Sequence, residues 1–247
     1  MVIREIVSKS ILSASKIYPY VLNPYVGCQF GCSYCYARYM KKFTGHKEPW
    51  GDFVDVKINA IELLRKEVVK RKVDRVWISG VCDPYQPLEA KYKLTRGCLK
   101  ILIDNHWPVV IQTKSNLVLR DIDIIQKAIN CDVGLSIATA DDKIRRLFEP
   151  KSIPIPDRIE ALEELHDHGI KTYAMIAPIL PGAECIVALL EGKVDYIYVD
   201  RMNYEYARSV YKKNQLDEYL DSDYFYEVER KIAFDCNKAD IACTIVH

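Results

Sequence analysis

Several features that mark other classes of protein are missing from this 247-residue sequence. No window approaches the run of about 18 apolar residues that a membrane-spanning helix needs. The first twenty residues lack an apolar core long enough for a secretory signal. Glycine and proline are scarce, at 10 and 11 residues, which argues against a fibrous or disordered chain. We therefore expect a globular protein of the cytoplasm with no membrane partner.

An excess of charge of one sign is missing as well. Lysine and arginine total 35 against 34 acidic residues, which leaves a formal charge of +1. A protein that coats a polyanion usually carries a large basic excess, so this balance argues against extended phosphate contacts, although a local basic patch is compatible with it. Neither a linker rich in serine and glycine nor an internal repeat is present. Because the length suits one hydrophobic core, we predict a single domain over residues 1–247.

Cysteine, by contrast, is plentiful. Nine cysteines in a chain without a secretory signal point to a reducing compartment. There they serve as metal ligands, catalytic thiols or small core residues more often than as disulfides. The odd number agrees with this interpretation.

Short apolar runs alternate with amphipathic helical stretches along the chain. The runs are rich in β-formers and nearly continuous, as in parallel strands that are covered on both faces; they are residues 20–23, 75–80, 108–113, 133–138, 171–176 and 195–200. The helical stretches are residues 60–72, 94–106, 120–130, 156–168, 184–191 and 204–220. A further strand is expected within residues 53–58. Six β-then-α units predict a parallel α/β fold, and counting alone leaves an open sheet and a partial barrel as alternatives.

Polar residues follow these predicted strands. In parallel α/β folds the chemistry takes place at the carboxyl ends of the strands, which lie together on one rim. The residues expected there are Asn23, Cys28, Gly80–Asp83, Lys114, Ser115, Ser136, Thr139, Pro178 and Asp200–Asn203. We expect the active site on this rim.

Three cysteines lie directly after the first strand, in the segment NPYVGCQFGCSYCYARYM. Cys28, Cys32 and Cys35 have the spacing C-x3-C-x2-C, and Gly27 and Gly31 let the backbone turn their sulfurs inward. An iron–sulfur cube normally takes four cysteines, so three in one loop leave one iron open to another ligand.

Other interpretations of this loop remain open at this point. The three thiols and His46 could bind a structural zinc ion. The protein could also be an electron-transfer module, or the thiols could carry no metal. Colour and response to added ligands distinguish these cases, since a zinc protein is colourless.

The three-cysteine loop after the first strand resembles that of the radical S-adenosylmethionine (SAM) superfamily. Tyr34, just before the third cysteine, also fits. Further blocks are similar to the branch related to spore photoproduct lyase: HKEPWGDFVDVKINA (46–60), SGVCDPYQPLEAKYKLTRGCLKIL (79–102), IQTKSNLVLRD (111–121) and YVDRMN (198–203). The resemblance implies a (βα)6 partial TIM barrel over about residues 18–203, with a C-terminal helical and strand extension over about residues 204–247.

The resemblance also implies two cofactors. Cys28, Cys32 and Cys35 would hold a [4Fe–4S] cluster whose open iron binds the methionine part of SAM. One electron from a reductant such as flavodoxin or ferredoxin would cleave SAM to a 5′-deoxyadenosyl radical, which abstracts hydrogen from the substrate.

Several positions match residues that contact SAM in the family. Tyr34 would lie against the adenine, and Ser79, Gly80 and Asp83, after the second strand, would surround the methionine amino group. Lys114 would pair with the SAM carboxylate. Ser136 is the expected ribose contact, with Thr139 as the alternative.

The sequence also departs from spore photoproduct lyase. The lyase uses a cysteine after its second strand as a hydrogen donor, and Gly80 stands at the corresponding place here. Cys82, two residues later, is a candidate hydrogen donor or SAM contact, or a small residue that fills a tight turn. The short chain and balanced charge argue against DNA lesion repair. A nucleic acid, a peptide and a small metabolite remain open as substrates.

Other residues are predicted to be structural. Cys98, Cys131 and Cys185 are expected in the core. A second metal site made of Cys236, Cys243 and His247 is disfavoured, because these ligands are too few for a cluster. The tyrosines at 196, 198, 204, 206, 211, 219, 224 and 226 are expected to pack the outer layer of the barrel with their hydroxyls at the surface.

Overall fold

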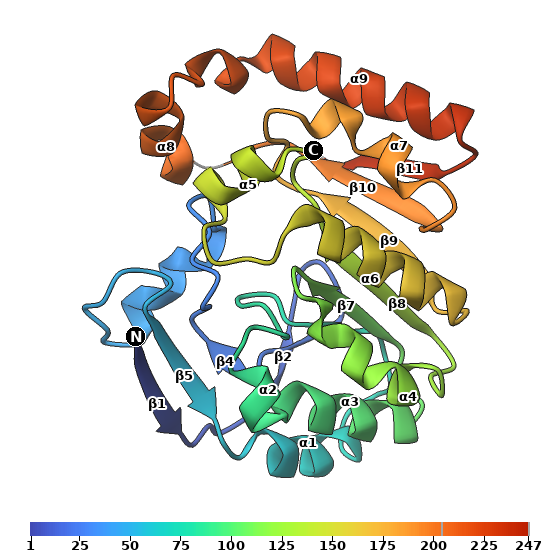
Figure 1. The fold of residues 1–247 in the computed structure, drawn as a ribbon. Helices are drawn as coiled ribbons and strands as arrows, with labels where there is room; N and C mark the ends of the chain where they lie inside the picture. Colours follow the sequence, from blue (N-terminus) through green and yellow to red (C-terminus); the bar gives the residue numbers. More distant parts are fainter. Residues whose placement is uncertain (204, 247) are drawn as a thin grey trace.

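The main sheet of the computed structural model, which describes residues 1–203 and 205–246, is built from the six predicted strands. These strands run parallel, as β3 (Tyr20–Leu22), β6 (Val76–Ile78), β7 (Val109–Thr113), β8 (Cys131–Ser136), β9 (Lys171–Ile176) and β10 (Tyr196–Asp200). β2 (Leu12–Ala14) is antiparallel to β3 at one edge, and β11 (Ala242–Val246) is parallel to β10 at the other. The predicted α/β fold is confirmed, and the curved sheet is consistent with a partial TIM barrel (Figure 1).

Helices cover the outer face of this sheet (Figure 1). They are α1 (Ala60–Val68), α3 (Leu94–Asp104), α4 (Ile122–Ile125), α6 (Ile155–Asp167), α7 (Val187–Leu190) and α9 (Ser222–Lys238). The short helices α2 (Glu89–Tyr92), α5 (Asp142–Phe148) and α8 (Arg208–Lys213) lie elsewhere, and α5 and α8 pack in the hydrophobic cluster that contains the cysteine loop. Alternate strand residues such as Ile111, Val133 and Ile197 pack with apolar helix residues in one large core. Because successive strand residues point to opposite faces, the residues between them line the inside of the barrel.

The inner face carries an aromatic cluster that corrects one expectation. Tyr196 and Tyr198 lie inside the barrel rather than in its outer layer, with their ring centroids 5.1 and 5.9 Å from that of Tyr173. Gly134 on β8 makes room for Tyr173, since a Cβ at this glycine would lie 2.2 Å from the tyrosine ring. Tyrosine is thus an interior residue here because a neighbouring strand supplies a glycine opposite it.

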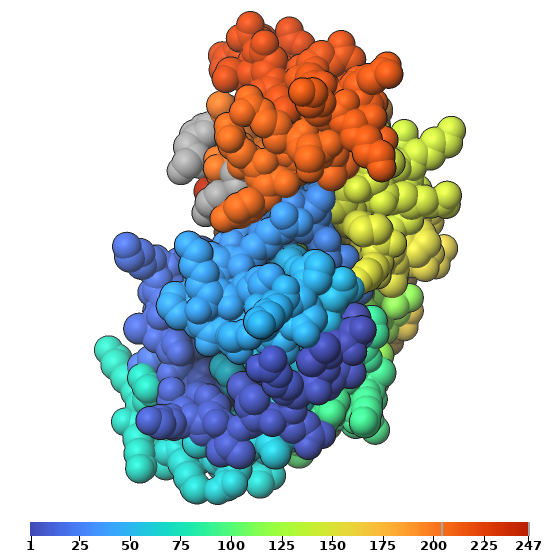
Figure 2. All heavy atoms as spheres, turned by 90° about the vertical axis from the view of Figure 1, so that its left-hand side faces the viewer, coloured from blue at the N-terminus to red at the C-terminus, as the bar shows by residue number. Residues whose placement is uncertain are grey.

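A second, smaller sheet stands beside the barrel. It contains β1 (Val2–Ile6), β5 (Phe53–Lys57) and β4 (Tyr25–Val26), and β5 is the expected strand within residues 53–58. The 3-10 helix η1 (Tyr36–Phe43) follows the third cysteine and lies near this sheet. Figure 2 shows the face of the molecule on which this segment, coloured light blue, is exposed. The chain therefore leaves β4, forms the cysteine loop and returns to β5 next to β4.

Some of the predicted elements differ from the structure. Residues 205–220 form three short pieces, η4 (Glu205–Ala207), α8 and η5 (Asp217–Leu220), instead of one helix, and Tyr204 lies outside the described residues. The long helix α9, which packs on the β10 side of the barrel, and strand β11 lie within the C-terminal helical and strand extension that the resemblance implies, although their bounds were not predicted. Cys98 is buried and Cys131 is partly buried, but Cys185 is exposed, so its expected place in the core is wrong. Within the described part of the chain, no helix has the length and apolar character needed to cross a membrane.

Candidate cofactor site

A cavity of about 400 Å³ opens at the carboxyl ends of the parallel strands. It lies on the rim that the sequence predicts and falls within the size range of small-molecule pockets, about 300–1,000 Å³. Of the eleven residues predicted to bind the cluster or to contact SAM, ten line it: Cys28, Cys32, Tyr34, Cys35, Ser79, Gly80, Cys82, Asp83, Lys114 and Ser136. The structure therefore brings the cysteine loop and four strand ends around one space.

Glutamine side chains fix the cysteine loop to the segment after β6. The Gln86 Oε1 atom accepts a hydrogen bond from the Gln29 backbone N–H at 2.9 Å, and its Nε2 donates to the Gly27 carbonyl at 3.3 Å. In return, the Gln29 Oε1 atom accepts from the Leu88 N–H at 2.6 Å. Gly27 has a φ of +90° and packs so closely on Phe53 that a side chain would collide with it. The first cysteine is thus held from both sides.

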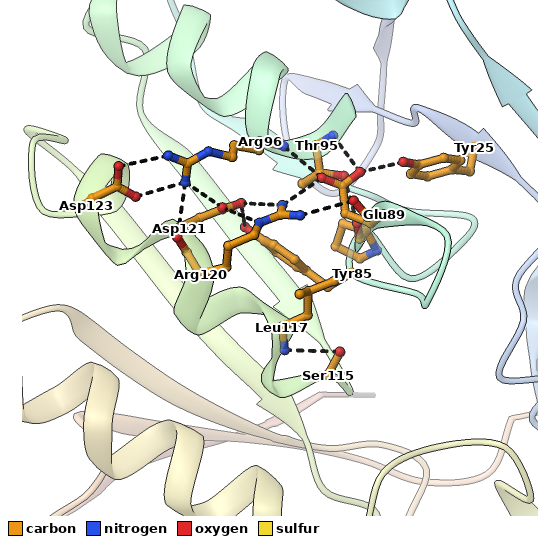
Figure 3. Close-up of polar contacts among 11 residues, drawn as sticks. Tyr25, Tyr85, Glu89, Thr95, Arg96, Ser115, Leu117, Arg120, Asp121 and Asp123 are labelled. Carbon is orange, nitrogen blue, oxygen red and sulfur yellow. Dashed lines mark hydrogen bonds and ion pairs between the residues drawn. The ribbon is translucent and has the colours of Figure 1, made fainter. Parts of the chain in front are cut away.

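The segment that holds the loop is itself anchored by a buried polar network (Figure 3). Glu89 is fully buried and accepts hydrogen bonds from the Tyr25 hydroxyl at 2.5 Å, the Thr95 N–H at 3.0 Å and Arg120 at 2.8 Å. Arg120 also bonds Asp121, which is likewise fully buried. Because Tyr25 is in β4 and Arg120 follows β7, this network ties the base of the cysteine loop to the barrel.

The three thiols lie in surroundings that disfavour their uncompensated charge. Burial raises the pKa of Cys32 to about 12, and the nearby charges of Lys114 and Arg158 oppose this by stabilising the thiolate. Burial likewise raises the pKa values of Cys28 and Cys35. At Cys35 the Ala37 N–H and the cations Lys114 and Arg38 act in the opposite direction. A metal centre would supply the positive charge that buried thiolates require.

A group of buried charges stands behind the loop. Glu149 and Arg158 form an ion pair at 2.5 Å, and both side chains are almost fully inaccessible to solvent. The Tyr34 hydroxyl donates to the same carboxylate, and the Lys114 Nζ atom lies 4.0 Å from it. Burial acts to raise the pKa of Glu149, but Arg158 and Lys114 outweigh it and hold the pKa below its usual value. Glu149 is therefore ionised and is shared by two cations.

Lys114 is placed for an anionic ligand. Its Nζ atom lies 5.7 Å from the centre of the Tyr34 ring, and Lys114 lines the cavity. Burial acts to lower the pKa of this lysine, but the Glu149 charge, together with smaller contributions from Cys32 and Asp83, holds the pKa above its ordinary value. The lysine thus presents a permanent positive charge to the cavity.

Ser136 and Asp83 take different parts in the site. The Ser136 carbonyl accepts from Arg158 at 2.7 Å, and its hydroxyl accepts from Gln112 at 3.2 Å, which leaves the hydroxyl proton for another acceptor. Asp83 accepts hydrogen bonds from the Thr113 hydroxyl at 2.6 Å and the Lys114 N–H at 2.7 Å. Asp83 consequently clamps the end of β6 to the end of β7.

Ser79, Gly80 and Cys82 form the turn after β6. The Ser79 hydroxyl donates to Asn23 at 3.0 Å and lies 2.9 Å from the Cys82 sulfur. Burial raises the pKa of Cys82 to about 12, and the hydrogen bond with Ser79 partly opposes this shift. The Gly80 carbonyl accepts from the Tyr36 hydroxyl. Cys82 is therefore a neutral thiol at neutral pH that borders the cavity.

Thr139, the alternative ribose contact, does not line the cavity. It is buried, its hydroxyl donates to the Pro181 carbonyl at 2.6 Å, and it accepts from the Asp141 N–H at 3.0 Å. Asp200, Arg201 and Asn203 do line it. Asn203 donates to Asp200 at 2.9 Å, whereas Arg201 pairs with Glu229 of α9 at 2.6 Å.

The donor set of this cavity does not match a structural zinc site that includes His46. His46 lies between Glu48 at 3.0 Å and Asp55 at 2.9 Å, so it is not directed at the thiols. Over residues 1–203 and 205–246, no three histidine, cysteine or acidic side chains converge closely enough to bind one ion. Cys28, Cys32 and Cys35 border a wider space instead. This arrangement fits a multi-iron cluster, in which each cysteine binds its own iron.

Buried polar atoms without hydrogen-bond partners near the cysteine loop also fit a bound cluster. Four buried side-chain polar atoms in the described residues lack a hydrogen-bond partner: Ser33 Oγ, Arg38 Nε, Trp50 Nε1 and Tyr211 Oη. Two lie within or just after the cysteine loop, and Trp50 and Tyr211 pack in the hydrophobic cluster that contains the cysteines. Burying such a group without a partner costs about 1–3 kcal/mol. Sulfur atoms of a bound cluster would be acceptors in this region.

The disfavoured second metal site would be formed near the C-terminus by Cys236, Cys243 and His247. The thiols of Cys236 and Cys243 interact with each other, where α9 packs against β11. His247 lies outside the described residues. No third ligand joins the two thiols within the described chain.

Sequence reasoning missed Glu149, Arg158 and Trp50. Arg158 carries a signal that could have been used, because it stands at an apolar position of α6, between Ile155 and Leu162. A charged residue in a buried stripe needs a buried partner. Glu149 has no such pattern, since it follows the end of α5 in a short loop.

Comparisons with known proteins agree with this geometry. A family model described as the radical SAM superfamily matches residues 22–184. An uncharacterized protein of Methanocaldococcus jannaschii is 38% identical over 221 residues, which cover 87% of this chain and 81% of that protein. A radical SAM Nα-GlyT isomerase of Pseudomonas phage M6 is 25% identical over 162 residues, which cover 65% of this chain and 33% of the phage protein. The structure of spore photoproduct lyase complexed with dinucleoside spore photoproduct has a TM-score of 0.69 at 15% identity, covering 98% of this chain and 81% of the lyase, and shows the same fold.

Proposed function

The chain belongs to the radical SAM superfamily, and from this premise we propose that it is an enzyme that binds a [4Fe–4S] cluster through Cys28, Cys32 and Cys35 and SAM beside it. The observation that carries the proposal is the position of the three buried thiols. They share one cavity with the cation of Lys114, at the carboxyl ends of six parallel strands. Three ligands leave one iron for SAM.

When bound, the cofactors would supply electron transfer, reductive cleavage of SAM and hydrogen abstraction from the substrate. The protein itself binds and orients the cofactors and excludes water from the site. Lys114 offers a positive charge to the SAM carboxylate, and the Ser136 hydroxyl is free to donate to a ribose oxygen. Tyr34, fixed through its hydroxyl by Glu149, presents its ring to the cavity.

The rim on the β10 side is the proposed place for the substrate. Asp200, Arg201 and Asn203 line the cavity there without being part of the cysteine loop. A one-electron donor such as flavodoxin or ferredoxin would be the reductant. The phage relative is named an isomerase. For this chain we propose the radical-forming step and not the isomerisation.

Electron paramagnetic resonance (EPR) of anaerobically reconstituted, dithionite-reduced protein tests the proposal. We expect a [4Fe–4S]⁺ signal that changes when SAM is added, together with formation of 5′-deoxyadenosine. The Cys32→Ala variant should lose the signal. Cys98→Ala, which removes an equally buried thiol on α3, should keep it.

Three results would contradict the proposal. A cluster signal that ignores SAM would favour an electron-transfer module. Protein that binds zinc but no iron would indicate a structural metal site. Loss of the signal in Cys98→Ala as well would show that the three-cysteine loop is not the specific ligand set.

A further inference from the structure

Trp50 presents a buried hydrogen-bond donor to the cysteine loop. Its indole Nε1–H makes no hydrogen bond of ordinary geometry within the described residues. The side chain packs in the hydrophobic cluster that contains Cys28, Cys32 and Cys35. An orphaned buried donor is costly in a native protein, so it calls for a missing acceptor.

A tight turn sets the position of this indole. The Asp52 N–H donates to the Pro49 carbonyl at 3.1 Å, and Gly51 has a φ of +99°. These are the marks of a type II turn, with Trp50 at its second position and the required glycine at its third. The sequence PWGD therefore encodes the local geometry that presents the indole.

A close approach of two glycines joins this turn to the cysteine loop. A Cβ on Gly51 would lie 2.7 Å from the Gly31 Cα atom, a separation that real side chains do not tolerate. Lys151 reinforces the contact by donating to the Gly51 carbonyl at 3.0 Å and the Asp52 carboxylate at 2.7 Å. Because Gly31 precedes Cys32, this contact packs the turn directly against the cysteine loop.

Packing then restricts the orientation of the ring. Trp50 meets Phe53 edge to face, with centroids 5.8 Å apart and an angle of 82°. Phe53 in turn stacks on His46 at 4.2 Å. Of the three cysteines, Cys35 is the one that lies beside the indole N–H.

We propose that the Trp50 indole N–H donates a hydrogen bond to the Cys35 sulfur when that sulfur is a cluster ligand, and that this bond raises the reduction potential of the cluster. The inference rests on the proposed function. Reduction adds negative charge to the cluster, and hydrogen bonds to its sulfurs stabilise that charge. Trp50 is thus a positioning residue that acts on electron delivery through Cys35.

Potentiometric titration of the cluster, followed by EPR, tests the effect. Trp50→Phe keeps an aromatic ring but removes the N–H, and we expect its midpoint potential to be more negative than that of the wild-type protein. Trp107→Phe is the matched control, because Trp107 is buried against Tyr20 outside the cysteine cluster, and its potential should equal the wild-type value. Equal potentials in Trp50→Phe and wild type, at equal iron content, would overturn the inference.

A second measurement does not depend on the variant. Electron–nuclear double resonance of wild-type protein labelled with ¹⁵N-indole tryptophan and exchanged into deuterium oxide should show an exchangeable proton and a nitrogen coupled to the cluster. The coupling should persist in labelled Trp77→Phe, which removes the indole that lines the cavity. Absence of the coupling in a cluster-containing wild-type protein overturns the inference alone. Failure of the wild-type protein to assemble any cluster would instead overturn the proposed function.

Discussion

The Arg158 guanidinium and the Glu149 carboxylate form an ion pair that is buried away from solvent. Arg158 is fully buried, Glu149 is 1% exposed, and their atoms are 2.5 Å apart. Tyr34 and Lys114, which face the cavity, hold on to the same carboxylate. The stability of the protein and the shape of its cofactor site therefore depend on one side chain.

The first prediction concerns Glu149→Gln, which keeps the shape of the side chain but removes its charge. Arg158 would remain buried without a counter-ion, and removing one partner of a buried pair typically costs about 3–5 kcal/mol. We expect this loss in the free energy of unfolding, measured by urea denaturation of the cluster-free protein. Glu62→Gln breaks the exposed pair with Lys66 and should leave the midpoint unchanged. Similar midpoints for both variants would contradict the prediction.

Much of the fold was predictable because parallel strands covered on both faces are continuous apolar runs. β9 begins and ends as predicted, and β7 begins one residue later than predicted. The three-cysteine loop was equally visible, since its spacing is local in sequence. Residues 205–220 were mispredicted because their apolar positions pack on the cysteine cluster through short turns rather than along one helix.

The contacts that shape the site were less predictable. Glu149 meets Tyr34 across 115 positions of sequence, and no periodic pattern records such a contact. Trp50 looked like part of a sequence block, but its role depends on the approach of Gly51 to Gly31 in space. The sequence indicates which polar side chains lie at the ends of the strands. Which of these side chains contact one another depends on the conformation of the loops.

The second prediction concerns Lys114 and SAM. Lys114→Met keeps the length of the side chain and removes the positive charge proposed to pair with the SAM carboxylate. Hydrogen bonds to charged groups contribute about 1.5–3 kcal/mol, so the dissociation constant for SAM should rise by roughly 10–150-fold. The SAM-dependent change of the EPR signal measures this constant. Lys70→Met, an exposed position just after α1, is the control, and an unaltered constant in Lys114→Met would refute the assigned role.

The third prediction is a pH dependence that centres on Asp142. Hydrogen bonds from Arg145 lower the pKa of this carboxyl to about 2, and the Ile155 N–H assists them. The folded-state pKa is depressed below the unfolded value of about 3.9, so the stabilisation is present above pH 4 and disappears as the pH falls toward 2. Arg145 also holds the carbonyls of Glu149 and Ser152, so this pair secures the loop behind the cavity.

Asp142→Asn isolates this contribution. Its free energy of unfolding should be lower than that of wild type at pH 7, and the two should converge between about pH 4 and pH 2. Chemical denaturation across this range measures the difference, with the exposed substitution Glu218→Gln as the control. A difference between wild type and Asp142→Asn that stays constant down to pH 2 would show that the carboxylate charge is not what stabilises the loop.

The fourth prediction separates backbone strain from collision at Gly51. Gly45 and Gly51 both have positive φ values, +68° and +99°, but a Cβ on Gly45 would meet nothing within 4 Å. Gly45→Ala should therefore cost only the left-handed conformation, about 1–2 kcal/mol. Gly51→Ala adds a collision with Gly31, and overpacking costs typically a further 1–3 kcal/mol. Thermal unfolding of the two cluster-free variants measures both, and equal losses would mean that the turn and the cysteine loop are not in rigid contact.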